Sequence, residues 1–226
     1  ARENVEHKNL NTNNRGPATG ETGTIVHYTY DSPLLFEIEA LAPWLKDQNY
    51  TGDFDLNFMV QEDGTPVCLE TTARPGYPIS IFQADNIDME YGDYLISLIE
   101  GNLEELPIKE NWSCGVVVFA PGFPFKESFH KHGKGRHIEE VKKLYEPGKY
   151  IYDMGKDEEG FYTDGHYGAV LIATAHSDSL ESCVENCYKV LEDWKLPNWL
   201  AWRDDIGRKL CDKDLAWFQE RNLLSD

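Results

Sequence analysis

The stretch that most constrains the fold is a pair of alternating apolar and polar runs, 53–61 and 65–74, on either side of Glu62-Asp63-Gly64. Two such runs around an Asp-Gly turn predict a β-hairpin. Oxygen-bearing side chains two residues apart share one face of a strand, because side chains alternate between the two faces. These side chains are Asp55 and Asn57 on the first strand, and Glu70 and Thr72 on the second. Mg²⁺ prefers such hard oxygen donors, so the pattern indicates either a metal–nucleotide site or an ordinary solvated sheet face.

The composition is that of an acidic globular chain. Of its 226 residues, 41% are hydrophobic, and 40 Asp and Glu against 21 Lys and Arg give a net charge of −19. This length allows one large domain or two smaller ones, and the negative charge disfavours a nucleic-acid surface. No apolar run approaches the roughly 20 residues of a membrane span, and no secretory signal is visible. We therefore expect a cytoplasmic protein with neither nucleic-acid nor membrane partners.

The five cysteines argue against a disulfide framework or a zinc site. They are odd in number and lie mostly within apolar patterns, which is typical of reduced, buried thiols in a cytosol. Cys183 and Cys187 are one helical turn apart, and this spacing suits the buried face of a helix better than a metal site.

Hydrophobic periodicity predicts a mixture of helices and strands. Besides the hairpin, it indicates helices over 31–46, 89–100, 177–194 and 212–224, and strands over 24–30, 115–120, 150–152 and 169–175. Asp31 and Pro33 supply a capping side chain and an early proline for the first helix, and Gly101 a C-cap for the second. The polar segment 102–112 marks a boundary, a loop rich in Gly, Lys and His follows residue 120, and a turn lies at 157–160. The fold class is therefore α+β.

Five short motifs follow one another along most of the chain. They are Glu6-His-Lys8, Arg15-Gly-Pro-Ala-Thr-Gly-Glu-Thr-Gly23, Leu69-Glu-Thr-Thr-Ala-Arg-Pro-Gly-Tyr-Pro78, Cys114-Gly-Val-Val-Val-Phe-Ala-Pro-Gly-Phe-Pro124 and Trp202-Arg-Asp-Asp-Ile-Gly207. They resemble, in the same order, the DHKR, GPNTGGMG, LEFNxRFGDP, CVVLASGGYP and YRRDIG segments of the ATP-grasp ligases of the phosphoribosylamine–glycine ligase family (glycinamide ribonucleotide synthetases). Each motif alone is a weak signal, but their shared order and spacing make the resemblance specific.

The resemblance implies a domain organisation. The C-terminal half of an ATP-grasp domain, with the hairpin and a substrate loop, is expected at 1–105, and a small β-rich C-terminal domain of ligase type at 106–226. Within the latter, Arg203 and Asp205 are expected to hold this domain onto the core rather than to touch substrate. In the family, the segment similar to residue 1 lies near the middle of the polypeptide. We therefore expect a carboxy-terminal half, present as a fragment or a separately encoded subunit, whose partner is the missing N-terminal half.

The resemblance also implies a site. Members of the family use ATP and Mg²⁺ (or Mn²⁺) to convert a small-molecule carboxylate to an acyl phosphate, which an amine substrate attacks, in purine biosynthesis. Metal ligands are expected at Glu70 and at Thr72, which replaces the family's Asn, with Asp55 and Asn57 on the same face. Arg74 matches the family's arginine two residues after the second ligand, and it is the predicted catalytic residue. Substrate contacts are expected from Gly16, Pro17, Thr19, Gly20, Glu21, Gly23, Arg74 and Tyr77.

Departures from the family are concentrated around the substrate. Glu21 brings a carboxylate to the substrate loop, Tyr77 replaces an Asp, and Ala169 replaces an arginine. Two functions are therefore open: a carboxylate–amine ligase with an altered substrate, or a non-catalytic homologue that binds a nucleotide or a partner. Retention of Glu70 and Arg74 favours the first, and the departures favour the second. Because the family encloses its nucleotide between two halves, we expect this chain alone to be inactive.

Overall fold

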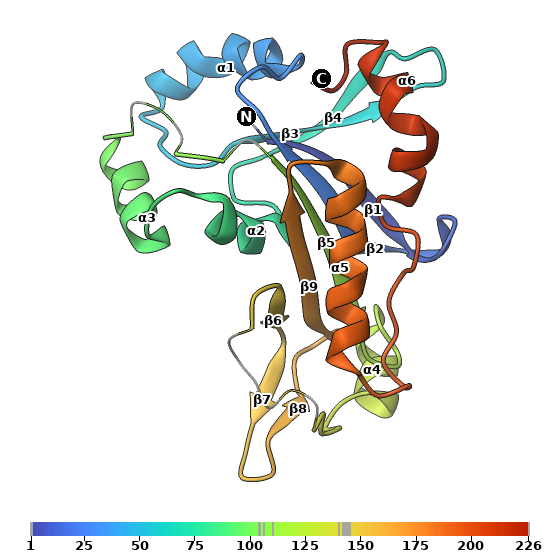
Figure 1. The fold of residues 1–226 in the computed structure, drawn as a ribbon. Coiled ribbons are helices and arrows are strands. Elements are labelled where there is room, and N and C mark those ends of the chain that lie inside the picture. Colours follow the sequence, from blue (N-terminus) through green and yellow to red (C-terminus); the bar gives the residue numbers. More distant parts are fainter. Residues whose placement is uncertain are drawn as a thin grey trace. The chain divides into compact units, whose positions relative to one another are not determined.

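The computed structural model describes residues 2–103, 105, 107–109, 111–139, 141 and 146–225 (Figure 1). The strands are β1 (Arg2–Asn11), β2 (Arg15–Tyr28), β3 (Asp55–Val60), β4 (Pro66–Thr72), β5 (Asn111–Phe119), β6 (Lys149–Ile151), β7 (Met154–Lys156), β8 (Phe161–Thr163) and β9 (Ala169–Ser177). The helices are α1 (Leu35–Asp47), α2 (Ile79–Asn86), α3 (Tyr91–Glu100), α4 (Lys126–His132), α5 (Leu180–Trp194) and α6 (Leu215–Gln219), and a π-helical turn, Leu210–Asp214, precedes α6. In this described part of the chain, every helix is too short or too polar to cross a bilayer.

The chain forms two compact units. Unit 1 comprises Ala1–Glu3, His27–Asn111 and Leu210–Asp226, and unit 2 comprises Asn4–Val26 and Trp112–Lys209. The mixture of helices and sheet confirms the α+β class. The small β-rich C-terminal domain, and the division into domains at 1–105 and 106–226, remain predictions; Leu106, at that boundary, lies outside the described residues.

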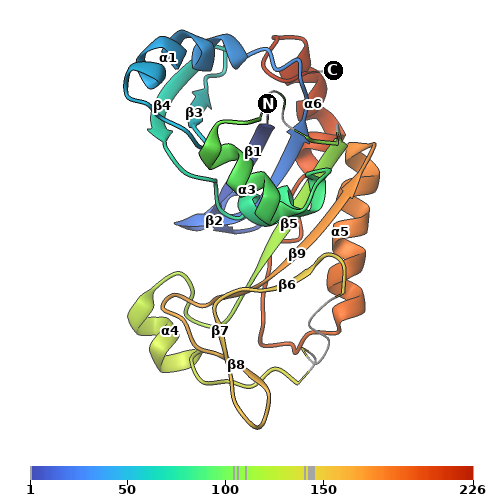
Figure 2. The same ribbon diagram turned by 90° about the vertical axis from the view of Figure 1, so that its left-hand side faces the viewer.

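Unit 2 is built on most of a five-stranded sheet with the order β1-β2-β5-β9-β6. All of β5 is buried, and β5 pairs with β9 in antiparallel register from Trp112↔Ser177 onwards. Helix α5 runs beside β9 (Figures 1 and 2), and its N-cap is Ser179, whose Oγ accepts a hydrogen bond from the Ser182 amide. The apolar face of α5 is buried, including Cys183 and Cys187, which confirms the reading of their spacing.

The region after β5 differs from the predicted loop. It contains α4, which ends in a run of His and Lys at residues 130–132. Composition alone hid this helix, because its polar residues show little helical periodicity around the buried Phe129. The expected turn at 157–160 is present between β7 and β8, where Asp157 Oδ1 accepts hydrogen bonds from the amides of Glu159 and Gly160.

Unit 1 contains the β3–β4 hairpin with α1, α2 and α3. Helix α3 ends at Gly101, whose φ of 68° confirms the predicted left-handed C-cap. Helix α1 is present, but its N-cap is Leu34 and no side chain caps it, so the predicted Asp31–Pro33 start is wrong. Helix α2 was not predicted. The last predicted helix is shorter than expected, because α6 ends at Gln219.

Both ends of the described chain meet within unit 1. The Ser225 amide and Oγ donate hydrogen bonds to the Glu3 carboxylate, and Ser225 Oγ lies 2.8 Å from His27 Nδ1. These contacts with the start of β1 fix the segment that follows α6. Cys68 in β4 is exposed, contrary to the general expectation of buried thiols, while Cys114 is buried in β5.

Candidate functional site

The predicted β3–β4 hairpin is present and closes through the predicted turn. Gln61 and Thr65 pair across its neck, and the Gly64 amide donates to the Gln61 carbonyl at 2.9 Å. Gly64 has a φ of +89°, a conformation that glycine adopts without strain, and Asp63 Oδ1 accepts from the Thr65 amide. Asp63 and Gly64 therefore form the turn through a side-chain hydrogen bond and a positive φ.

The register of the hairpin brings the predicted oxygen donors onto one face. Asp55 lies opposite Thr72, and Asn57 lies opposite Glu70. Directly opposed residues in an antiparallel pair have Cβ atoms roughly 5 Å apart. Thr72 Oγ1 donates a hydrogen bond of 3.4 Å to Asp55 Oδ2, so the first pair already interacts. The second pair lies next to a bulge in the register after Asn57.

An arginine lies close to the carboxylates at this end of the hairpin. Arg2 forms a close ion pair with Asp53, and its Nη2 lies 3.8 Å from Asp55 Oδ1. Burial raises the pKa of Asp55, and Asp53 adds to that rise, while Arg2 and Thr72 oppose it. Glu70 is exposed, and among the described residues it makes no hydrogen bond or ion pair. Of the two carboxylates on this face, that of Glu70 is therefore more available to a ligand than that of Asp55.

These donors fit a hard cation in chemical type. Carboxylate, amide and hydroxyl oxygens are the ligands that Mg²⁺ takes, usually with water and phosphate oxygens completing the shell. Within the described part of the chain, no three His, Cys, Asp or Glu side chains come together as a metal site. A cation here would thus depend on Glu70 and Asp55 together with Asn57, Thr72 and oxygens from a bound nucleotide.

Two further predicted residues follow the hairpin. Arg74 is exposed, and its Nη1 donates only to the neighbouring Pro75 carbonyl, at 3.0 Å, among the described contacts. Its guanidinium contributes to stabilising the ionised form of Asp55, which opposes the raised pKa of that group. Tyr77 is half-buried and precedes a cis peptide bond to Pro78. Their role in catalysis and substrate binding remains a prediction.

The predicted substrate loop, 16–23, is part of a strand, so its predicted loop conformation is wrong, while its substrate contacts remain a prediction. Residues 15–28 form β2, which follows β1 across a tight turn where Asn13 and Asn14 have φ of 59° and 53°. Paired positive φ values are typical of a type I′ hairpin turn, and Asn tolerates them. The Asn-Asn pair was the missed signal. Thr19 Oγ1 and Thr22 Oγ1 donate to the Lys8 and His7 carbonyls of β1, at 2.7 and 2.8 Å.

The glycines of this strand have different local roles. A Cβ at Gly23 would lie 2.7 Å from the Gly115 carbonyl oxygen and 2.8 Å from Ile206 Cγ1, so Gly23 permits close packing inside unit 2. Gly16 has a φ of +82° next to the turn, whereas Gly20 faces open space. Pro17 and Thr19 are half-buried.

Glu21 is the least expected residue of β2. Its side chain is only 3% exposed, and its Oε1 has no hydrogen-bond partner in the described structure. Burial raises the pKa of Glu21 well above its ordinary value, and Glu6 adds to that rise, while Lys8 and Thr24 oppose it. The neutral carboxyl is therefore favoured, which weakens a charge-repulsion argument at this position. That Glu21 lines a substrate pocket remains a prediction.

In the last motif, the buried Arg203 forms an ion pair with Asp205. The guanidinium of Arg203, 1% exposed, makes paired hydrogen bonds of 2.7 Å to Asp205 and a third to the Asn9 carbonyl. Asp205 also accepts from the Asn13 amide. Burial and the Arg203 charge lower the pKa of the adjacent His7 to about 4. The hydrogen bonds to Asn9 and Asn13 join the 202–207 segment to the β1–β2 hairpin.

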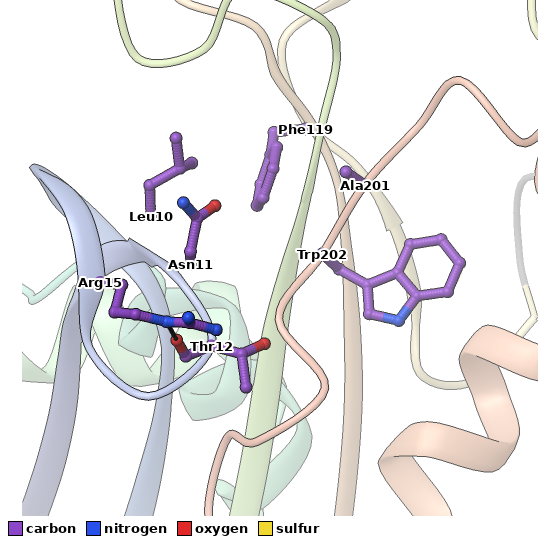
Figure 3. Close-up of a pocket in the computed structure, with 7 residues that line it drawn as sticks. All are labelled: Leu10, Asn11, Thr12, Arg15, Phe119, Ala201 and Trp202. Atoms are coloured by element: carbon purple, nitrogen blue, oxygen red, sulfur yellow. Dashed lines mark hydrogen bonds between the residues drawn. The ribbon is translucent and has the colours of Figure 1, made fainter.

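Unit 2 also contains a cavity of about 440 Å³, open to solvent, next to the Arg203–Asp205 pair (Figure 3). Its lining comprises Leu10, Asn11, Thr12, Arg15, Phe119, Ala201 and Trp202. The Arg15, Phe119 and Trp202 walls come from different sequence motifs that resemble the ligase family. The proximity of these motifs depends on the pairing of distant strands, so sequence patterns do not predict it.

The chain is similar in sequence to phosphoribosylamine–glycine ligases. It is 24% identical to the enzyme of Vibrio parahaemolyticus, over 92% of this chain and 50% of that protein. It is 27% identical to that of Fusobacterium nucleatum, over 90% of this chain and 48% of that protein. A bifunctional purine biosynthetic protein of Pichia angusta is 26% identical over 81% of this chain. The chain thus spans about half the length of the ligases that it matches, and no protein-family model matches it.

Solved structures show the fold. The phosphoribosylamine–glycine ligase of Thermotoga maritima superposes with a TM-score of 0.68 at 23% identity, over 90% of this chain and 50% of that one. The biotin carboxylase domain of Hydrogenobacter thermophilus 2-oxoglutarate carboxylase, solved with MgADP and bicarbonate, gives 0.54 at 14% identity, over 91% of this chain and 48% of that one. The chain therefore has the fold of one half of these ATP-grasp proteins, as the sequence motifs predicted.

Proposed function

We propose that this chain is the carboxy-terminal half of an ATP-dependent carboxylate–amine ligase of ATP-grasp type, acting in purine biosynthesis or on a related substrate pair. The observation that carries the proposal is the hairpin register, which places Glu70 opposite Asn57 and Asp55 opposite Thr72. A chain similar to phosphoribosylamine–glycine ligases thus presents hard oxygen donors together on one strand face, at the positions where the resemblance expects them.

The proposed site binds a magnesium–nucleotide complex through the hairpin. When bound, Mg²⁺ neutralises charge on phosphoryl oxygens and orients them. Glu70 supplies the accessible carboxylate, and Asn57 supplies a neutral oxygen beside it. Arg2 and Thr72 hold Asp55 in place. The exposed guanidinium of Arg74 is suited to bind phosphate or carboxylate oxygens in a bidentate manner.

The proposed partner is a polypeptide that corresponds to the other half of the relatives. The chain matches about 50% of their length. Helix α1 has no buried residue, and it exposes Phe36 and Trp44 by 58% and 57%. Monomeric proteins rarely leave large apolar surfaces uncovered. Enclosure of the nucleotide between two polypeptide halves would account for both observations.

The proposed substrates are a small carboxylate and an amine. In the resembling family the acid becomes an acyl phosphate that the amine attacks. Ala169, where the family has an arginine, is buried at the start of β9 opposite Phe119. Loss of that arginine supports a substrate pair different from glycine and phosphoribosylamine, because a phosphate would lose one cationic partner.

Nucleotide binding tests the proposal. MgATP and ATP with excess EDTA are titrated into the full chain, into Glu70→Gln and into Glu62→Gln, and binding is followed calorimetrically. Glu62 is an exposed residue of the same hairpin turn and provides the matched control. We expect Mg²⁺-dependent binding that Glu70→Gln weakens about tenfold and Glu62→Gln leaves unchanged. Binding that is equal in all three proteins, or independent of Mg²⁺, would overturn the metal assignment.

Turnover distinguishes the two functions. The chain alone is expected to hydrolyse ATP far more slowly than about 1 s⁻¹, a common enzyme rate, and to gain activity when the other half is supplied. The hydrogen bond between Thr72 and Asp55, which engages two proposed ligands with each other, is the observation that favours the non-catalytic alternative. Nucleotide binding without turnover in the reconstituted protein would establish that alternative.

A further inference from the structure

The cavity in unit 2 has a composition that suits a ligand of its own. We propose that it binds a small anion that carries a flat ring, such as an aromatic or heterocyclic carboxylate or phosphate ester. Its volume of about 440 Å³ lies within the range of small-molecule sites. The lining places the Arg15 guanidinium, the Asn11 amide and the Phe119 ring around the same space, and Trp202 also borders it (Figure 3). The proposal concerns unit 2 alone and does not depend on ligase activity.

Arg15 supplies the positive charge. Its Nε donates to the Thr12 carbonyl at 3.2 Å, which holds the guanidinium across the β1–β2 turn (Figure 3). In the described part of the chain, the two Nη groups make no hydrogen bond or ion pair. A guanidinium with free Nη groups binds carboxylate or phosphate oxygens in paired, charge-assisted hydrogen bonds. An anion in the cavity would satisfy these donors.

Asn11 supplies a second polar group, and Gly16 makes room for it. A Cβ at Gly16 would lie 2.9 Å from Asn11 Nδ2, closer than side-chain atoms tolerate. The absence of that Cβ lets the Asn11 amide lie along the cavity wall. An amide offers both a donor and an acceptor, so it can bind an anion or a polar atom of a ring.

Phe119 supplies the aromatic wall. Its ring stacks against Phe123 with centroids 5.1 Å apart and an interplanar angle of 19°. Paired backbone hydrogen bonds between Phe119 and Ala201 fix this rim of the cavity. Leu10 contributes the opposing apolar side chain (Figure 3). A rigid phenyl ring with an aliphatic group across from it favours a flat, apolar ligand over a compact inorganic ion.

Nearby carboxylates determine how strongly an anion is held. Thr12 Oγ1 donates to Asp204 at 2.6 Å, and the Asn13 amide donates to Asp205. Arg203 neutralises Asp205 through two short hydrogen bonds, but no cation among the described residues pairs with Asp204. The charge of Asp204 therefore opposes that of Arg15. This opposition predicts effects of opposite sign from the two residues.

A panel of simple probes tests the ligand class. Benzoate and phenyl phosphate carry both the ring and the anion, acetate and inorganic phosphate carry only the anion, and benzamide carries only the ring. Binding to the full chain is measured by NMR titration. We expect benzoate, phenyl phosphate or both to bind at least about fivefold more tightly than the other probes, with shifts at residues 10–15 and 119. The two ring-bearing anions separate a carboxylate site from a phosphate site.

Two variants test the assigned charges. Arg15→Gln should weaken binding of the preferred probe about tenfold, and Asp204→Asn, which keeps an acceptor for Thr12, should strengthen it about two- to threefold. Lys126→Gln, at an exposed cation on α4 in the same unit, is the matched control and should change nothing. Absence of binding by any ring-bearing anion up to about 10 mM would overturn the proposal. Equal affinity for all anions, or the same sign of effect from both variants, would also overturn it.

Discussion

The two units differ in how much of their apolar surface they bury. In unit 2, every residue of β5 is buried, and so is the apolar face of α5. In unit 1, no residue of α1 is fully buried, and Ile99 on α3 and Leu69 on β4 are 74% and 60% exposed. Hydrophobic stabilisation scales with the apolar area removed from water, at about 25 cal/mol per Å². The β5–α5 core of unit 2 is therefore already removed from water, whereas unit 1 leaves apolar side chains that a covering polypeptide could bury.

The exposed apolar residues of unit 1 share elements with the proposed nucleotide site. Met59 and Val67 lie opposite each other on the β3–β4 hairpin, near the Asn57–Glu70 pair, and they are 59% and 39% exposed. A surface that combines oxygen donors with apolar side chains is suited to contact both a nucleotide and a covering polypeptide. The comparison thus links incomplete burial in unit 1 to the proposed need for a second half.

The largest expected effect tests the core of unit 2. Replacing Arg203 with Met should lower the free energy of unfolding by about 3–5 kcal/mol, because Asp205 would lose its buried partner. Urea unfolding followed by circular dichroism measures the change. Arg221→Met, in unit 1, is the control: its guanidinium is partly exposed and rests over the Trp217 ring at 4.3 Å. We expect a cost below about 1 kcal/mol there. Equal costs in the two units would break the comparison.

A smaller change in the free energy of unfolding is expected at Glu21, the buried carboxyl of β2. Glu21 has a raised pKa in the folded chain, so between its ordinary value of 4.5 and that raised value the folded state holds one more proton than the unfolded state. The free energy of unfolding therefore falls as the pH rises through this range. Glu21→Gln cannot ionise and should be more stable than wild type by about 1–2 kcal/mol near pH 8, with little difference near pH 4.

Thermal or urea unfolding across that pH range measures the effect of Glu21→Gln. Glu139→Gln, at an exposed carboxyl of the same unit, should follow the wild-type profile. A Glu21→Gln profile parallel to that of wild type would mean that Glu21 is ionised in the folded chain. Water would then reach the Glu21 carboxylate although this residue is only 3% exposed.

Local signals account for what the sequence predicted. The β3–β4 hairpin followed from alternation around Asp63-Gly64, and the end of α3 followed from Gly101, because both depend on backbone preferences of a few residues. The long β1–β2 hairpin is not predicted although Asn13-Asn14 marks its turn, because the glycines that follow resemble a family loop. The sequence did place the oxygen donors of the hairpin on one face.

Features created by tertiary packing could not be predicted in the same way. The burial of Glu21 depends on the strands that pair with β2, and no local pattern distinguishes it from an exposed strand carboxylate. The cavity beside Arg15 depends on Phe119 and Trp202, which lie far away in the sequence. The isolated bridge between Phe119 and Ala201 brings these walls together, so only the folded chain reveals the space between them.

The smallest expected effect concerns the exposed face of α1. Trp44 is 57% exposed, so Trp44→Ala should change the free energy of unfolding by no more than about 0.5 kcal/mol. Trp194→Ala is the matched substitution in unit 2, where the side chain is 5% exposed, and it should cost about 3–5 kcal/mol. When a polypeptide corresponding to the other half of the relatives is supplied, Trp44→Ala should weaken its association measurably if α1 is covered. A cost above about 1.5 kcal/mol for Trp44→Ala in the chain alone would show that α1 already packs, and unit 1 would then need no partner to bury this face.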